Sequence, residues 1–163
     1  IKKKFIIFNQ EMFYYKFNLS LPNLNWFGSK ACKLKYLKDI DFLRNIKNRE
    51  YSYFRFDTLF SRHKQNSVKI IENGGWHFSN LKTHKELEKK YLNDENHAEY
   101  ELQNISLSDI ENNVKKKIVP YNHKAKKDSV DRYKNTKLDK VNINVLPQYL
   151  SNNLDKFDDW IAK

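Results

Sequence analysis

The chain contains little cysteine, glycine and proline, and it lacks any long apolar run. Its 163 residues include one cysteine, three glycines and three prolines. Cys32 has no second cysteine with which to form an internal disulfide, so a reducing compartment is expected. A membrane-spanning helix needs about 18 or more consecutive apolar residues, and the sequence has no such run. A cytoplasmic protein without a membrane span is therefore predicted.

Short motifs that identify common enzymes are also absent. The sequence has no G-x-G-x-x-G dinucleotide fingerprint, no P-loop and no G-x-S-x-G nucleophile elbow. Its five histidines and single cysteine do not occur at the spacings of a local zinc site. Nucleotide or metal binding therefore cannot be assigned from one local motif.

Positive charge and aromatic residues are abundant. Lysine and arginine number 31 against 20 acidic residues, which gives a net charge of +11 at pH 7. This charge favours an anionic partner such as nucleic acid, membrane phosphates or a phosphorylated substrate, although a solvated lysine-rich surface would also account for it. The aromatic content of 15% supports a hydrophobic core, so disorder of the whole chain is not expected.

The spacing of apolar residues predicts short strands alternating with helices. Helix starts are marked by Asp39, by the capping box that begins at Thr83 and by a similar pattern at Ser108. The predicted helices cover residues 3–18, 39–47, 83–92, 108–117 and 154–161, and the predicted strands cover residues 51–56, 67–72 and 141–145. This order favours an α/β or α+β architecture, and we expect a mixed sheet flanked by helices in a single domain.

The most informative segment is Glu72–Ser79, with the sequence ENGGWHFS. It follows the β-branched run Val68–Ile71 and holds two of the three glycines, Gly74 and Gly75. A strand, a tight glycine turn and then an aromatic residue, a histidine and a hydroxyl form a typical arrangement at the carboxyl edge of a sheet in α/β enzymes. The two glycines would permit positive φ angles and the close approach of a ligand.

The side chains near this turn could bind a ligand or transfer protons. Trp76 offers a flat aromatic face, and His77 offers a metal ligand or a proton-transfer group near neutral pH. The alternative for His77 is a structural turn residue bonded to the backbone. Glu72 and Glu99 are candidates for a general base, with a solvated surface position as the alternative for each.

A basic, loop-like segment follows at residues 121–137. Lys127 and Arg132 could hold a diphosphate through charge-assisted hydrogen bonds, and Asp128 lies between them in the sequence. An ordinary solvated loop is the alternative interpretation of this segment.

The segment Gly74-Gly75-Trp76-His77-Phe78-Ser79 resembles a turn of glycosyltransferase family 17, the family of β-1,4-mannosyl-glycoprotein 4-β-N-acetylglucosaminyltransferase. Bacterial members have a similar Gly-Trp-His-Phe-Ser turn after a strand. Other segments similar to the family occur in the same order over nearly the whole chain, at residues 13–18, 26–30, 97–100, 127–132 and 146–150. The Gly-Trp-His-Phe-Ser turn is the most specific of these matches.

The resemblance implies an inverting transfer of N-acetylglucosamine, or a related sugar, from a UDP-sugar donor to a hydroxyl of an acceptor glycan. It also implies a GT-A type nucleotide-sugar-binding fold and a divalent cation, Mn²⁺ or Mg²⁺. The family's Asp-rich segment for metal and nucleotide does not occur in this sequence. Residues 1–163 are therefore expected to be the C-terminal portion of one glycosyltransferase domain, and activity of this portion alone is not implied.

Roles for nine residues are expected from the turn and from the same resemblance. The catalytic candidates are His77, Glu72 and Glu99, the substrate-binding candidates are Gly75, Trp76, Ser79, Lys127, Asp128 and Arg132, and His77 is also the candidate metal ligand. Trp76 is expected to stack on a sugar ring. No nucleic-acid partner is implied, and basic faces could give peripheral contact with an anionic membrane.

Two other interpretations stay open. A basic nucleic-acid-binding module is supported by the net charge and by the mixed aromatic and basic residues of Tyr51–Arg55, although no recognition motif occurs. A non-catalytic fragment is the third. Protection by UDP against unfolding would favour the transferase, and salt-dependent binding to single-stranded nucleic acid would favour the module.

Overall fold

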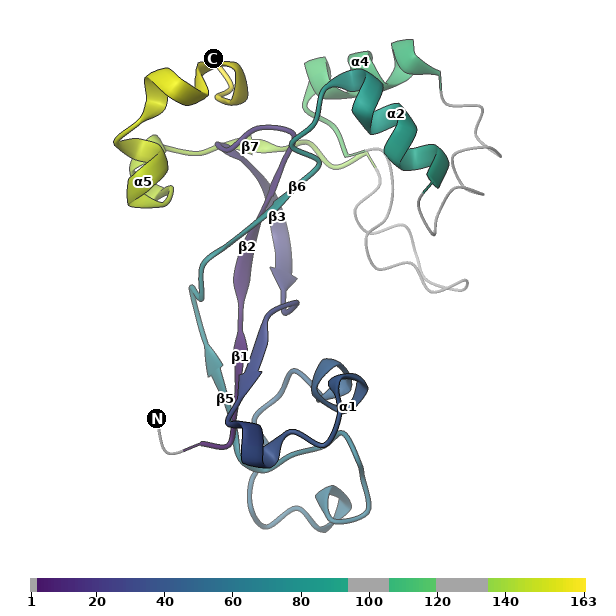
Figure 1. Ribbon diagram of the computed structural model, residues 1–163, viewed down its shortest axis with the longest axis vertical. Coiled ribbons are helices and arrows are strands. Elements are labelled where there is room, and N and C mark those ends of the chain that lie inside the picture. Colours follow the sequence, from purple (N-terminus) through teal and green to yellow (C-terminus); the bar gives the residue numbers. More distant parts are fainter. Residues whose placement is uncertain (1–2, 94–105, 120–134) are drawn as a thin grey trace. The chain divides into compact units, whose positions relative to one another are not determined.

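A computed structural model describes residues 3–93, 106–119 and 135–163 (Figure 1). The chain forms two compact units, the first from Ile1–Glu11 and Leu24–His77, the second from Met12–Asn23 and Phe78–Lys163. Strands and helices are both present and the strands form two sheets, so the predicted mixed α/β class is confirmed. None of the described helices combines the length and apolar character that crossing a bilayer requires.

A three-stranded mixed sheet organises the first unit, in the order β4-β1-β5. Strand β1 (Phe5–Phe8) pairs antiparallel with β4 (Lys30–Cys32) and parallel with β5 (Val68–Ile71). The register of the parallel pair sets Phe5 opposite Val68. Because the pairing of β1 and β5 is parallel, both strands end at the same edge of the sheet, where the glycine turn begins.

One face of this sheet is covered by helix α1 (Ile40–Asn45). Phe5 and Ile7 alternate with less buried residues along β1, which is the period of a half-buried strand. Phe42 of α1 packs edge-on against the Phe5 ring, with the ring centroids 5.7 Å apart. Asp39 caps the helix by accepting a hydrogen bond from the Phe42 backbone N–H at 2.6 Å, so the predicted cap is confirmed.

The second sheet has four strands in the order β6-β2-β3-β7. These are β6 (Trp76–Ser79), β2 (Gln10–Tyr14), β3 (Leu19–Trp26) and β7 (Asp139–Lys140). Strand β3 pairs antiparallel with β7. The sequence pattern did not predict β6, because Trp76–Ser79 were interpreted as part of the glycine turn.

The helices of the second unit pack in two groups. Helices α2 (His84–Asn93) and α4 (Leu107–Lys116) lie against each other (Figure 1). The C-terminal segment contains α5 (Gln148–Ser151) and the short 3₁₀ segments η3 (Ile143–Val145) and η4 (Leu154–Trp160). Apolar side chains from this segment cluster around Phe13 of β2; they include Leu146, Leu150 and Phe157.

A buried asparagine fastens the C-terminal end of the chain to the start of β3. The Asn18 side chain donates to the Ala162 carbonyl at 3.0 Å and accepts from the Ala162 backbone N–H at 2.7 Å. Asn18 is 1% exposed, so both hydrogen bonds lie out of reach of water. Buried polar groups that are hydrogen-bonded in this way fix one register of the chain.

Two predicted helix starts are confirmed within a few residues. The Thr83 backbone N–H donates to the Glu86 carboxylate at 2.9 Å, and α2 begins at the next residue, as predicted. The cap of α4 is Ser106, which forms a reciprocal capping box with Asp109. The helix was expected to start from Ser108, so its cap lies two residues earlier than predicted.

Four element predictions are wrong. Residues 3–18 form β1 and β2 rather than a helix, because their aromatic and β-branched side chains favour pleated pairing with distant strands. Residues 51–56 form turns leading to the 3₁₀ segment η2 (Phe56–Thr58) rather than a strand. Residues 141–145 contain η3 instead of a strand, and residues 154–161 form the kinked 3₁₀ segment η4 instead of an amphipathic α-helix.

Candidate functional site

The glycine turn joins β5 to β6 and is bonded to the connection between β1 and β2. The Gly74 backbone N–H donates to the Asn9 carbonyl at 2.7 Å, and the Asn9 N–H donates to the Ile71 carbonyl at 3.0 Å. The Glu11 N–H donates to the Gly75 carbonyl at 3.0 Å. These backbone bonds fix the turn at the carboxyl edge of the parallel pair, where the sequence predicts a site.

Both glycines are required by the backbone. Gly75 has φ of +116°, a conformation that side-chain-bearing residues rarely adopt, so the predicted positive φ is confirmed there. Gly74 is required for space, since a Cβ at this position would lie 2.9 Å from the Ile71 carbonyl oxygen and 2.9 Å from the Phe8 Cβ. The turn is therefore closely packed as well as tight.

Replacing Gly74 with alanine should lower the free energy of unfolding by about 1–3 kcal/mol, because the added methyl group meets backbone that cannot move without breaking the turn. Urea unfolding followed by circular dichroism would measure the loss. Asn73→Gly is the matched control, because Asn73 already has φ of +50° and glycine adopts this conformation freely. A loss for Asn73→Gly equal to that for Gly74→Ala would contradict the steric explanation.

His77 lies flat against Trp26. The two ring centroids are 4.7 Å apart and the ring planes differ by 30°. Trp26 is the last residue of β3 and His77 is the second residue of β6, so the pair depends on the β6-β2-β3 strand order. The sequence patterns did not indicate Trp26 as a site residue. Its sequence signal was the Trp26-Phe27-Gly28 bend, because the missing side chain of Gly28 leaves room for the indole.

Gly28 fits closely beside this indole. A Cβ at Gly28 would lie 2.3 Å from the Trp26 Nε1 atom, so any larger residue would displace the ring. The indole therefore occupies the space that Gly28 leaves open, in the position from which it stacks on His77. This packing orients the imidazole before any ligand binds.

Trp76 and Phe78 project differently from His77. Successive side chains of a strand point to opposite faces, so Trp76 and His77 lie on opposite faces of β6. Trp76 is 40% exposed, and its carbonyl accepts from the Gln10 side chain at 3.3 Å. Phe78 packs against Phe13 with ring centroids 5.3 Å apart. Ser79, two residues after His77, shares the face of His77 by the same alternation.

Glu72 lies at the start of the turn with its carboxylate exposed. Its Oε2 atom accepts a hydrogen bond from the Asn9 side chain at 2.6 Å. This bond orients the carboxylate and leaves its second oxygen to accept a proton. Glu72 thus lies at the beginning of the turn, and His77 lies in the strand that follows the turn.

The described residues do not assemble a metal site. Within residues 3–93, 106–119 and 135–163, no group of three or more His, Cys, Asp or Glu side chains comes together. The expected role of His77 as a metal ligand therefore stays a prediction. Four predicted site residues lie outside the described residues: Glu99, Lys127, Asp128 and Arg132.

The second unit contains a cavity that sequence analysis missed. Its volume is about 350 Å³, and its lining consists of Tyr15, Lys16, Lys82, Thr83, His84, Val114, Asp159 and Trp160. The Lys16 ammonium group lies 5.5 Å from the centroid of the Trp160 ring. These residues come from four separate parts of the sequence, so no local motif could have indicated them.

Comparisons with known proteins leave the family open. No protein-family model matches the chain, and comparison with curated proteins and with solved structures gives no significant match. The resemblance to glycosyltransferase family 17 therefore rests on the sequence motifs quoted above.

Proposed function

We propose that the chain forms the C-terminal portion of a glycosyltransferase that transfers N-acetylglucosamine, or a related sugar, from a UDP-sugar to a glycan hydroxyl. The observation that supports this proposal best is the histidine held flat on a tryptophan beside a closely packed glycine turn. A GT-A type fold is part of the same proposal. The mixed sheet with a turn at its carboxyl edge agrees with it.

His77 is proposed as the group that accepts the proton of the acceptor hydroxyl. Stacking on Trp26 involves one face of the imidazole, whereas its two nitrogen atoms exchange protons and hydrogen-bond in the ring plane. Imidazole exchanges protons near neutral pH, and a positioned base of this kind typically contributes about 10²–10⁴-fold to a rate. Among the described residues, Glu72 is the alternative candidate for this base.

The remaining residues are proposed to bind substrate. Trp76 would stack on the apolar C–H face of one sugar ring, and the Ser79 hydroxyl would bond a hydroxyl of another, because Trp76 lies on the opposite face of β6 from His77 and Ser79. Gly75 would allow the substrate to approach the backbone. Lys127 and Arg132 would contact the diphosphate, with Asp128 beside them. Glu99 would serve as a further candidate base.

Ligand-dependent thermal stability tests the proposal directly. UDP-N-acetylglucosamine at about 100 times its dissociation constant should raise the melting temperature by roughly 5–10 °C, because ligand binding stabilises the folded state by mass action. The measurement is differential scanning fluorimetry, with manganese expected to enlarge the rise. ADP-glucose is the control nucleotide sugar. Equal shifts for both nucleotide sugars, or no shift for any UDP-sugar, would count against the transferase.

A further inference from the structure

Residues 53–60 form a loop whose large apolar side chains face solvent; we call it the aromatic loop. Phe54 is 90% exposed and Phe60 is 91% exposed. Three more large apolar residues in the same loop are also mostly exposed, namely Tyr53, Phe56 and Leu59. Such a concentration of exposed apolar groups marks an interaction surface, for another protein or for a membrane.

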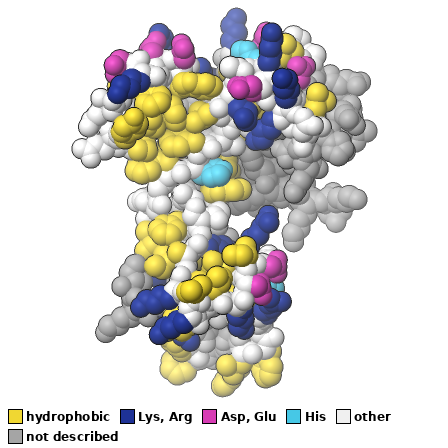
Figure 2. All heavy atoms as spheres, in the orientation of Figure 1, with side chains coloured by type: hydrophobic (Ala, Val, Ile, Leu, Met, Phe, Trp, Pro, Cys, Tyr) yellow, Lys and Arg dark blue, Asp and Glu magenta, His cyan; other side chains and the backbone are white. Residues whose placement is uncertain are grey.

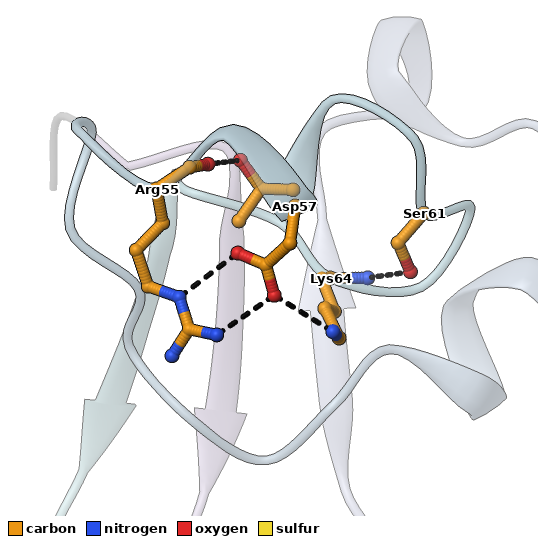
Figure 3. A network of polar contacts seen from close by, with 5 residues as sticks. Arg55, Asp57, Ser61 and Lys64 are labelled. Atoms are coloured by element: carbon orange, nitrogen blue, oxygen red, sulfur yellow. Dashed lines mark hydrogen bonds and ion pairs between the residues drawn. The ribbon is translucent and has the colours of Figure 1, made fainter.

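A network of polar contacts connects residues of the aromatic loop with residues that follow it (Figure 3). The Arg55 guanidinium donates two hydrogen bonds to the Asp57 carboxylate, at 2.9 and 2.7 Å, and the Lys64 ammonium donates a third at 2.7 Å. The Thr58 hydroxyl donates to the Arg55 carbonyl at 2.6 Å. The Arg55 and Lys64 bonds hold the pKa of Asp57 well below its usual range. The polar groups thus bond to one another, while the large apolar side chains of the loop lie mostly exposed.

The surroundings of the aromatic loop are positively charged. Residues 47–69 contain six lysines and arginines against two acidic residues. Both acidic residues are paired with cations, Asp57 as described and Glu50 with Lys69 at 3.3 Å. Lys3 adds a further charge, with its ammonium group 3.5 Å from the Tyr53 hydroxyl. Figure 2 shows lysine and arginine side chains beside hydrophobic ones on this unit.

A cavity of about 320 Å³ opens next to the aromatic loop. Its lining combines the loop residues Tyr53, Thr58 and Leu59 with Lys4, Lys64, Gln65, Asn66 and Ser67. Two lysines, Lys4 and Lys64, are among the lining residues, although the Lys64 ammonium is bonded to Asp57 and the Lys4 ammonium lies 5.2 Å from the centroid of the Tyr36 ring. The amide and hydroxyl groups of the lining add hydrogen-bonding capacity. Apolar walls next to cationic groups fit a phosphate headgroup whose acyl chains continue into an apolar phase.

We propose that the aromatic loop and this cavity dock the protein on an anionic lipid bilayer. The apolar side chains enter the boundary between headgroups and acyl chains, and the surrounding lysines and arginines contact the lipid phosphates. Leu59 argues for lipid over nucleic acid, since an aliphatic side chain does not stack on bases as aromatic rings do. The proposal stands independently of the transferase, because none of its residues belongs to the site around His77.

Vesicle co-sedimentation tests the docking surface. The protein should bind vesicles of phosphatidylcholine with phosphatidylglycerol, and bind pure phosphatidylcholine much more weakly. The double variant Phe54→Ser/Phe60→Ser should bind the anionic vesicles about tenfold or more weakly, because two large apolar groups no longer leave water. The separate variant Lys4→Gln should also weaken binding to anionic vesicles, and its effect should be larger at low salt than at high salt.

The control variant is Tyr149→Ser in the second unit. Tyr149 is 64% exposed, so this variant loses an exposed aromatic ring that lies outside the proposed surface. It should bind the anionic vesicles as the unaltered protein does. Unchanged melting temperatures would show that all variants are folded.

Four outcomes would overturn the proposal. They are absence of vesicle binding, equal binding to neutral and anionic vesicles, equal losses for Tyr149→Ser and the double variant, and self-association without lipid that the double variant abolishes. Tighter binding to single-stranded RNA than to anionic vesicles, with the same dependence on Phe54 and Phe60, would assign the surface to nucleic acid instead.

Discussion

Replacing Asn18 with alanine is expected to lower the free energy of unfolding by about 2–5 kcal/mol. The substitution removes both hydrogen bonds to Ala162 and leaves the Ala162 N–H and carbonyl without those partners. Ala162 is 8% exposed, so water replaces these bonds poorly. Urea unfolding followed by far-ultraviolet circular dichroism would measure the effect.

Two variants make this result interpretable. Asn48→Ala removes the same atoms at an exposed position and should change stability by less than about 0.5 kcal/mol. Asn18→Asp keeps an oxygen that accepts from the Ala162 N–H but loses the donor to the Ala162 carbonyl, so its loss should be substantial as well. If Asn18→Ala changes stability as little as Asn48→Ala does, the hydrogen bonds between Asn18 and Ala162 do not stabilise the C-terminal segment.

Replacing His77 with alanine in the full-length protein is expected to reduce UDP-sugar turnover about 100-fold or more, because a positioned proton acceptor is lost. The fall should appear in kcat, with a smaller change in KM, since the proposed role lies in the chemical step rather than in binding. His84→Ala is the matched control, because His84 is a second histidine on a different element, at the start of α2. Near-normal turnover for His77→Ala would remove the central assignment.

Trp26 variants separate positioning from chemistry. Trp26→Ala removes the ring on which His77 stacks, whereas Trp26→Phe retains a flat aromatic partner. We therefore expect kcat to fall in Trp26→Ala and to recover in large part in Trp26→Phe. A positioning role also predicts a changed pH profile of kcat in Trp26→Ala, because the imidazole exchanges an indole neighbour for water. Equal losses in both variants with an unchanged pH profile would point to a purely structural role.

The parts of the fold that were predictable from sequence depend on local interactions. Asp39 and Thr83 bond backbone groups within three residues, so their helices could be identified from a short pattern. The β5 strand and the glycine turn were predictable for the same reason, because a β-branched run ends at residues that tolerate unusual backbone angles.

The mistaken predictions concern segments whose structure is set by other parts of the chain or by competing side-chain bonds. The aromatic spacing of residues 3–18 matches a helical period, yet β1 pairs with strands that lie elsewhere in the sequence. At residues 141–145, the Asn142 side chain accepts from the Asn144 N–H and draws the backbone into a 3₁₀ turn. In residues 51–56, Arg55 pairs with Asp57 across a turn, which local alternation does not reveal.

The same distinction between local and long-range interactions applies to the candidate site. The turn and its two glycines follow from the sequence, because positive φ and close packing are local demands. The contact between Trp26 and His77 could not be predicted in this way. It needs β3, β2 and β6 to be neighbours in one sheet, and that order is a property of the whole chain.

The parallel pairing of β1 with β5 also determines when the turn can form during folding. The Lys4 backbone N–H bonds to the Ser67 side chain at a sequence separation of 63 residues, and β1 pairs with β5 next to this bond. Loops of such length close slowly because their ends lose much conformational freedom. Gly74 receives its hydrogen-bond acceptor from Asn9, which follows β1. We therefore expect the turn to complete its hydrogen bonds only after β1 and β5 have paired.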